Sequence, residues 1–430
     1  MTISVKNIAE HIGCETTIRG WLYNKRSSGS IAFLELRDGT GFVQAIVSKD
    51  DVDAAVWESA EKVTQESSVV ATGKVTKHPK KEGVFELQIS QLEIIQLAHE
   101  YPITKKEHGP DFLLDHRHLW LRSKRQWAVQ RVRDQVIQAI FDFFHQEGFI
   151  KIDTPIITPN ACEGATTLFS IKYFDEGTVY LSQSGQLYLE AAIMSVGRAF
   201  DFGPTFRAEK SKTKRHLTEF WMMDAEAAFV EHEESMKIQE NMICFIVARV
   251  LEKCPLEFEI LERNIEPLKK IAAPFARLTY TEAIAKLQSL ASDIKFGEDL
   301  GNDDEGLLTK DSAVPVFIEK WPKAIKPFYM KVDPSNPELV LNDDLIGIEG
   351  SGELIGGSQR EDDYEKLKAA ILREGLTGPE YEWYLDLRKY GSVPHSGFGL
   401  GLERTVGWLC GVEHIREAIP FPRLINRVRP

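Results

Sequence analysis

The chain has 430 residues, of which 43% are hydrophobic and 27% charged, and its formal net charge is −13. This composition predicts a globular protein with two or three domains, each able to bury a core. The acidic balance excludes binding of nucleic acid by bulk positive charge. No apolar run approaches the ~20 residues of a membrane-spanning helix. The N-terminal residues lack the basic start and apolar core of a secretory signal. The five scattered cysteines lack metal-ligand spacing, which predicts reduced thiols in the cytoplasm.

Residues 1–97 have the pattern of a small β domain. Five short alternating runs are separated by turn residues, with a helical stretch at 51–65 between the third and the fourth. This order predicts an OB-fold, whose open face binds single-stranded nucleic acid. Phe33 and Gln44 lie on neighbouring predicted strands, where one can stack on a base and the other read its edge. The alternative is that Phe33 belongs to the core and Gln44 to the surface.

A polar segment marked by proline and glycine, residues 98–122, predicts a linker. The remaining residues, 123–430, predict a second and larger domain with a mostly helical insertion around 230–342. A basic amphipathic helix is expected at its start, followed by a strand that Pro155 interrupts. Because proline cannot donate a ladder hydrogen bond, that strand suits an edge or an interface.

Residues 206–221 carry the most distinctive pattern, Phe-Arg-Ala-Glu followed by a cationic run and Leu-Thr-Glu-Phe-Trp. The aromatic flanks predict two paired strands with a polar connection. Arg207 can hold a phosphate and Glu209 an amino group, while Phe220 can stack under a flat base. Taken alone, a lysine-rich loop is more often a solvated surface feature.

Four further stretches contain candidate ligands. The segment 160–172, with its glycine and threonines, suits a loop that closes over a ligand. Gln186 and Glu190, at i and i+4, project from one face of a predicted helix. Asp344 and Glu353 are hard oxygen ligands for a Mg²⁺ shared with nucleotide phosphates. A glycine-rich strand at 394–402 allows close approach of a flat ligand and delivers an arginine to a helix start.

Three of these stretches occur in a fixed order: the strand with Pro155, the hairpin ending past Arg215, and Gly-Leu-Gly-Leu-Glu-Arg ending at Arg404. Together they resemble the three signature motifs of class II aminoacyl-tRNA synthetases. With the OB-fold ahead of them, the match is to the aspartyl, asparaginyl and lysyl subgroup, and it covers essentially the whole chain. The resemblance implies an α+β protein, an OB-fold β-barrel followed by a catalytic domain with an antiparallel sheet flanked by helices. It also implies a homodimer formed through the Pro155 region.

The resemblance also implies roles for individual residues. Arg207 and Arg404 are expected to be catalytic, holding the α- and γ-phosphates of ATP, and Phe220 to stack on adenine. The expected ATP-binding set is Arg207, Glu209, Arg215, His216, Leu217, Phe220, Glu353 and Arg404. The expected amino-acid-binding set is Glu163, Gln186, Glu190, Asp224 and Arg360. The expected metal ligands are Asp344 and Glu353, and the expected anticodon contacts are Phe33, Gln44 and Glu86.

The implied reaction consumes ATP. The amino-acid carboxylate attacks the α-phosphate to give an aminoacyl-adenylate and pyrophosphate, and the terminal ribose of the tRNA then takes the aminoacyl group. Aspartyl members carry a lysine in the helix after their Gln-Ser-Pro-Gln turn, whereas this chain has Leu189 followed by Glu190. A substrate with a side-chain carboxylate would find no lysine there to pair with and would lie near the like charge of Glu190. We therefore predict asparagine and its tRNA as substrates, with the amide donating to Glu190 and accepting from Arg360.

Three alternatives compete with this interpretation. The first is an aspartyl enzyme that also charges the asparagine tRNA, against which Leu189 argues. The second is a paralogue that makes asparagine from aspartate and ammonia, but such relatives typically lack the OB domain. The third is an RNA-binding protein with an inactive catalytic domain, which the joint presence of Arg207, Arg404, Asp344 and Glu353 disfavours.

Overall fold

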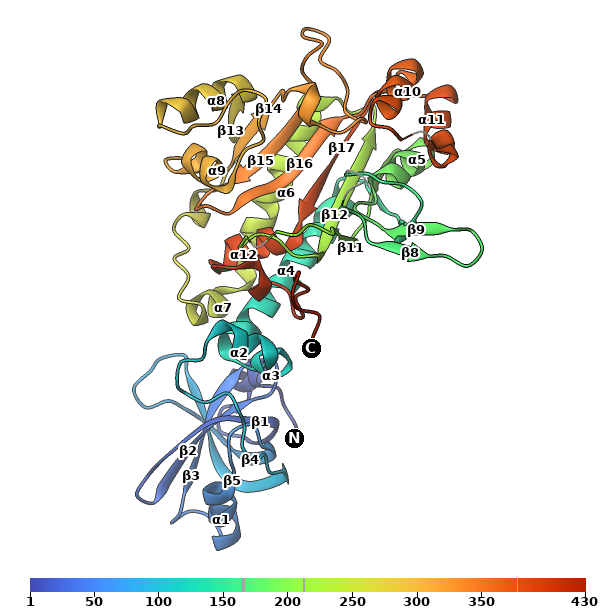
Figure 1. The fold of residues 1–430 in the computed structure, drawn as a ribbon. Coiled ribbons are helices and arrows are strands. Elements are labelled where there is room, and N and C mark those ends of the chain that lie inside the picture. Colours follow the sequence, from blue (N-terminus) through green and yellow to red (C-terminus); the bar gives the residue numbers. More distant parts are fainter. Residues whose placement is uncertain (164–166, 212, 377) are drawn as a thin grey trace. The chain divides into compact units, whose positions relative to one another are not determined.

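The computed structural model describes residues 1–163, 167–211, 213–376 and 378–430. The chain forms two compact units, Met1–Gly109 and Pro110–Pro430 (Figure 1). The boundary differs from the predicted one, because two short helices at 110–120 belong to the second unit. Arg117 in this segment is buried and donates hydrogen bonds to the carbonyls of Ile419 and Pro420, so the expected linker is partly folded into the larger unit. Residues 164–166 of the predicted closing loop, and Lys212 of the cationic run, lie outside the described residues.

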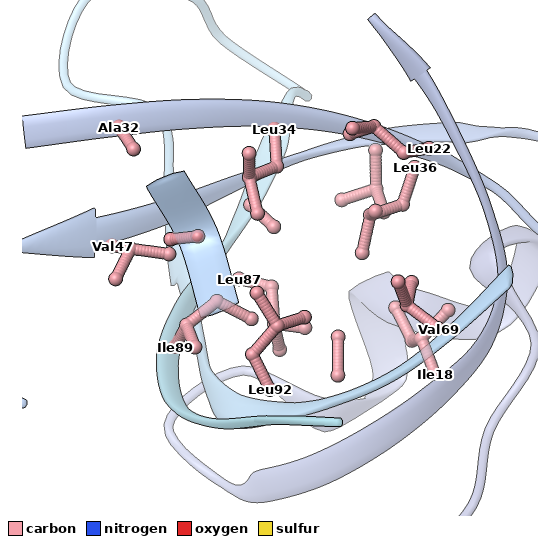
Figure 2. Packing of buried hydrophobic residues seen from close by; sticks show 14 of the residues in the cluster. Ile18, Leu22, Ala32, Leu34, Leu36, Val47, Val69, Leu87, Ile89 and Leu92 are labelled. Carbon is pink, nitrogen blue, oxygen red and sulfur yellow. The ribbon is translucent and has the colours of Figure 1, made fainter. Parts of the chain in front are cut away.

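The first unit is a closed five-stranded barrel with the strand order β1-β2-β3-β5-β4, which confirms the predicted OB-fold. Alternate residues of each strand point inward, and their apolar side chains fill the barrel, as Figure 2 shows for Ile18, Leu34 and Leu87. A 3-10 helix, η1 (Val5–His11), adds Val5 and Ile8 to this core. The other elements are β1 (Glu15–Ser28), β2 (Ile31–Arg37), β3 (Phe42–Ser48), α1 (Ala54–Lys62), β4 (Ser68–Lys77) and β5 (Phe85–Gln96).

The second unit is built on a nine-stranded sheet in the order β13-β14-β15-β16-β17-β12-β10-β6, with β11 paired to β12. The predicted antiparallel arrangement holds through the middle of the sheet, whereas the two outermost pairs, β13 with β14 and β10 with β6, are parallel. The strands of the sheet are β6 (Ile150–Lys151), β10 (Arg198–Phe200), β11 (Gly203–Phe206), β12 (Glu219–Ala228), β13 (Ala276–Thr279), β14 (Val316–Glu319), β15 (Asn342–Gly347), β16 (Gly352–Gln359) and β17 (His395–Gly401). A separate small sheet contains β7 (Ile157–Thr158), β8 (Ser170–Lys172) and β9 (Thr178–Leu181).

Helices cover this sheet (Figure 1). The long helix α6 packs against α4 and against strands β16 and β17. The helices of the unit are α2 (Pro110–Asp115), α3 (Arg117–Trp120), α4 (Lys124–Gln146), α5 (Gln186–Val196), α6 (His232–Lys253), α7 (Pro255–Ile260), α8 (Tyr280–Ser289), α9 (Asn302–Thr309), α10 (Tyr364–Arg373), α11 (Glu382–Lys389) and α12 (Leu402–Cys410). Short 3-10 turns are η3 (Leu268–Lys270), η4 (Lys323–Ile325), η5 (Pro379–Tyr381) and η6 (Ile415–Glu417). In the described part of the chain no helix combines the length and the apolarity needed to cross a bilayer.

The predicted insertion at 230–342 is not a separate helical element. It contains α6 to α9, but its strands β13 and β14 extend the main sheet, and the apolar cluster around Tyr280 and Trp321 packs beside them. The predicted hairpin is present as β11 and β12, joined by the cationic connection. The predicted strand-to-helix transitions are present as β9 to α5 and as β17 to α12.

Candidate active site

A cavity of about 530 Å³ opens at the strands β12, β16 and β17 of the second unit. It collects nearly all the residues that the sequence predicted for ATP, amino acid and metal, although they come from distant parts of the chain. Those that line it are Glu163, Gln186, Arg207, Glu209, Arg215, His216, Leu217, Phe220, Asp224, Asp344, Glu353, Arg360 and Arg404. Glu190 is the one member of these sets that does not line it.

Small residues on β16 and β17 shape the floor of the cavity. A Cβ atom added at Gly399 would collide with Met222 Cε and would lie 2.6 Å from Asp224 Oδ1. Gly401 has no such neighbour and lies open to the cavity. The glycines therefore leave room for a flat ligand against the sheet, which is the role that the sequence predicted for this strand.

Three of the arginines that line the cavity come from two segments, two from the connection between β11 and β12 and one from the start of α12. The Arg207 guanidinium lies 5.5 Å from the centre of the Phe220 ring, and its buried Nε has no hydrogen-bond partner among the described residues. Burial lowers the pKa of Arg207, but Glu163, Glu209 and other carboxylates outweigh it and raise that pKa overall. A permanently charged guanidinium with an unused donor suits an anionic oxygen.

The neighbouring cations are held by carboxylates. Arg215 donates to Glu305 Oε2 at 2.5 Å and to Asn302 Oδ1 at 3.0 Å, both on α9. Arg404 lies 3.5 Å from Glu353 Oε2, at the start of α12. Each arginine is thus positioned at the cavity wall before any ligand arrives.

Polar groups fix the part of the cavity lining around Asp224. Its Oδ2 accepts hydrogen bonds from Ser184 Oγ and from the Gly185 backbone N–H, both at 2.8 Å. Tyr329 donates to Glu163 Oε1 at 2.8 Å, and Gln183 Oε1 accepts the backbone N–H of Glu163 at 3.0 Å. Oriented carboxylates of this kind can receive the hydrogens of an ammonium group.

Glu190 occupies a different place from the expected one. Its carboxylate is fully buried behind Gln186, whose Nε2 donates to it at 3.2 Å. It also accepts from Arg388 at 2.6 Å and from the Tyr384 hydroxyl, and it contacts His395 Nε2 at 3.1 Å. Burial alone would raise the pKa of Glu190, but Arg388 and His395 reverse that effect and lower it. Gln186, which lines the cavity, thus contacts Glu190, and the direct contact of Glu190 with a substrate amide stays a prediction.

Arg360 lines the cavity, and it is already paired. Its Nε lies 3.0 Å from Glu226 Oε1, its Nη2 also donates to that oxygen, and its Nη1 donates to Ser358 Oγ at 2.6 Å. Both side chains are almost completely shielded from solvent. Burial raises the pKa of Glu226 and Arg360 opposes that shift. The two-contact geometry with a permanently charged guanidinium favours the carboxylate form of Glu226, which balances the positive charge of Arg360.

Two carboxylates meet above Gly356 on β16. A Cβ there would lie 3.0 Å from Glu353 Oε1 and 3.9 Å from Asp344 Oδ1. Asp344 is buried and is bonded by Lys326 Nζ at 2.7 Å. Burial, with Glu353 close by, raises the pKa of Asp344 to about 7 even though Lys326 opposes it. Within the described ranges no cluster of three or more His, Cys, Asp or Glu residues could hold a metal. Two hard carboxylates fit a Mg²⁺ whose other ligands are phosphates and water.

The three residues predicted to contact an anticodon lie together on the barrel of the first unit. Gln44 on β3 donates to Glu86 on β5 at 2.7 Å, and the two are direct neighbours in the parallel ladder. Phe33 on β2 is partly exposed, and the Arg26 guanidinium lies 4.5 Å from its ring centre. Arg26 also donates to Gln44 at 3.3 Å. A partly exposed ring, an arginine and an amide in one cluster suit stacking and edge recognition of a base.

Comparisons with known proteins agree with both units. Residues 109–425 match the family model described as tRNA synthetases class II (D, K and N), and residues 16–95 match that of the OB-fold nucleic acid binding domain. The chain belongs to the class II tRNA synthetases of the D, K and N group. The predicted family and fold are confirmed.

Solved structures of similar synthetases cover the whole chain. The asparaginyl-tRNA synthetase from Pyrococcus horikoshii, complexed with asparaginyl-adenylate, is 44% identical over 100% of both chains with a TM-score of 0.96. The Entamoeba histolytica asparaginyl-tRNA synthetase in complex with asparaginyl-adenylate is 31% identical over 100% of both chains, with a TM-score of 0.89. An aspartyl tRNA synthetase from Entamoeba histolytica is 27% identical over 100% of this chain and 93% of its own, with a TM-score of 0.83.

Sequence reasoning missed several groups of this synthetase site. Glu226 lies two residues after Asp224 on β12, so the period of a strand places both on one face, and this signal was available. Glu305 and Asp299 come from the segment near 296–312, and Lys326 follows η4. Those segments reach the cavity only through the tertiary fold, so no local pattern marks them.

Proposed function

We propose that this synthetase ligates L-asparagine to the asparagine tRNA through an asparaginyl-adenylate, with ATP as the energy source. The single observation that carries the choice of amino acid is the pairing of Arg360 with Glu226. A substrate side chain that reaches Arg360 meets a cation already balanced by a buried carboxylate. A neutral amide can accept from that guanidinium, whereas the aspartate carboxylate would add an unbalanced charge in a partly dry site.

The second charge pair strengthens the same argument. Glu190 is balanced by Arg388, both completely buried, so neither offers free charge to a ligand. At the position where aspartyl members carry a lysine, Leu189 is fully buried in an apolar cluster with Ile193 and Ala199. The amino-acid end of the cavity is therefore arranged for a neutral side chain. Asp224 and Glu163 remain to bind the α-amino group.

The geometry supports a reaction by positioning and charge stabilisation. Arg207, with its unused Nε donor, is placed to hold the α-phosphate while the asparagine carboxylate attacks it in line, and pyrophosphate leaves toward Arg215 and Arg404. Phe220 offers its ring to adenine. Asp344 and Glu353 would hold a Mg²⁺, which supplies neutralisation of the phosphate charge. The terminal ribose hydroxyl of the tRNA then displaces AMP, and no covalent protein intermediate is required.

Three further assignments complete the proposal. The anticodon is read at the barrel by Phe33, Gln44 and Glu86. The five free thiols are consistent with a cytoplasmic enzyme.

A homodimer forms through the Pro155 region, where Ile150, Ile156 and Ile157 are each 44–48% exposed. An Ile156→Asp variant that remains dimeric at micromolar concentration in sedimentation velocity would contradict this interface.

Exchange of labelled pyrophosphate into ATP tests the proposal directly, with asparagine and aspartate in parallel. Exchange with asparagine alone is the expected result. Exchange with aspartate would favour an aspartyl enzyme, and formation of free asparagine from aspartate, ATP and ammonia would favour the asparagine-making paralogue. No exchange with either amino acid would leave an RNA-binding protein.

A further inference from the structure

Lys326 is a cavity residue that the proposed reaction leaves without a role. It follows η4, and its side chain is only 13% exposed. Its Nζ lies 2.7 Å from Asp344 Oδ2 and 3.8 Å from the centre of the Trp321 ring. Trp321 is itself buried in the apolar cluster beside β14, so the lysine has a rigid support on one side and a carboxylate on the other.

The lysine lies among acidic groups. Asp344 and Glu353 meet above Gly356, and Asp299 lines the same cavity. Two nearby buried carboxylates repel each other unless a cation lies between or beside them. In the protein alone that cation is Lys326, with Arg404 on the far side of Glu353.

A divalent cation and the lysine compete for one carboxylate. Mg²⁺ approaches a carboxylate oxygen to about 2.1 Å, so it would lie within a few ångströms of an ammonium group that still contacted Asp344. Lysine has a flexible four-carbon stem and can swing away. The face of Trp321 offers its ammonium a second favourable position.

We propose that Lys326 is the resident counter-cation of the metal site: it neutralises Asp344 in the nucleotide-free enzyme and yields Asp344 to the divalent cation that enters with ATP. The lysine then faces the nucleotide phosphates from the Trp321 side. This inference rests on the proposed metal role of Asp344 and Glu353. It makes Lys326 a positioning residue that keeps the empty site from binding metal without its nucleotide.

Binding of Mn²⁺ to the full-length, nucleotide-free protein tests the inference, with free Mn²⁺ measured by electron paramagnetic resonance. Lys326→Met removes the competing charge, so Mn²⁺ should bind about tenfold more tightly than in the wild type. Lys326→Arg keeps the charge and should stay near the wild-type value. Lys331→Met is the matched control, because it removes a lysine that contacts Asp362 at 2.6 Å outside the cavity lining.

Unchanged or weaker Mn²⁺ binding in Lys326→Met would overturn the role of the lysine and leave the proposed function intact. Adding Asp344→Asn to Lys326→Met separates the two ideas, because loss of the metal ligand should abolish the gain. If the double variant binds Mn²⁺ as tightly as Lys326→Met does, the metal assignment itself fails. Where nucleotide-free binding is too weak to detect, calorimetry decides. The affinity for ATP in EDTA, divided by that in Mg²⁺, should fall about tenfold in Lys326→Met, and an unchanged ratio would refute the proposal.

Discussion

Replacement of Glu226 by glutamine probes the choice between asparagine and aspartate. The variant keeps the shape of the side chain and removes the charge that balances Arg360. At about 4 Å and an effective dielectric constant near 20, one such charge pair corresponds to roughly 4 kcal/mol. The glutamine amide and water in the cavity replace part of the lost interaction energy with Arg360. We therefore expect discrimination against aspartate to fall by about 2–3 kcal/mol, or roughly 30- to 150-fold.

Pyrophosphate exchange provides the measurement, as the ratio of kcat/KM for asparagine to that for aspartate. The aspartate value should rise, since its carboxylate now finds an unpaired guanidinium. Glu66→Gln is the matched control, because Glu66 forms an equally buried two-contact ion pair with Arg37 in the barrel unit. A Glu226→Gln enzyme that is folded by circular dichroism and keeps the wild-type ratio would refute the charge-balance argument.

Three further predictions concern stability and tRNA. Burial and the nearby Asp224 raise the pKa of Asp201 to about 7, so in the folded state this carboxyl holds a proton that the unfolded chain has lost above about pH 4. The free energy of unfolding should therefore fall as pH rises from 4 to 7. Asp201→Asn should raise the free energy of unfolding in urea by up to about 4 kcal/mol at pH 8 and by less at pH 5. Equal effects at both pH values would count against the raised pKa of Asp201. Gly399→Ala should destabilise the ligand-free protein by about 1–3 kcal/mol and lower its melting point, because the added Cβ would collide with Met222 and Asp224. Gly401→Ala should leave the melting point unchanged, because no atom lies within 4 Å of its added Cβ. Phe33→Ala should raise KM for the tRNA by about tenfold or more through lost stacking, while asparagine-dependent pyrophosphate exchange stays unchanged; a change in both would indicate a core role for Phe33.

Local patterns determined much of this protein. The alternating strands of the barrel, the hairpin with Arg207 and the glycine strand that ends at Arg404 could all be predicted, because their signals lie within short segments. These segments carry the family's motifs, so the residues expected to bind ATP could be named from them. Glu86 was named with Gln44 only through the family resemblance, and their contact comes from the pairing of β3 with β5 in the barrel.

Only the tertiary structure decided how the charges are shared. Glu190 and Arg360 looked like partners for one amide, yet the fold gives Glu190 to Arg388 and Arg360 to Glu226. It also brings Lys326 to Asp344 and Glu305 to Arg215 from segments with no motif of their own. An ion pair depends on which side chains meet across the sheet and on how deeply they are buried. Local residue spacing determines neither the partner of a charged side chain nor its burial. The charged residues of a site can therefore be predicted from the sequence, whereas their ion-pair partners depend on the tertiary fold.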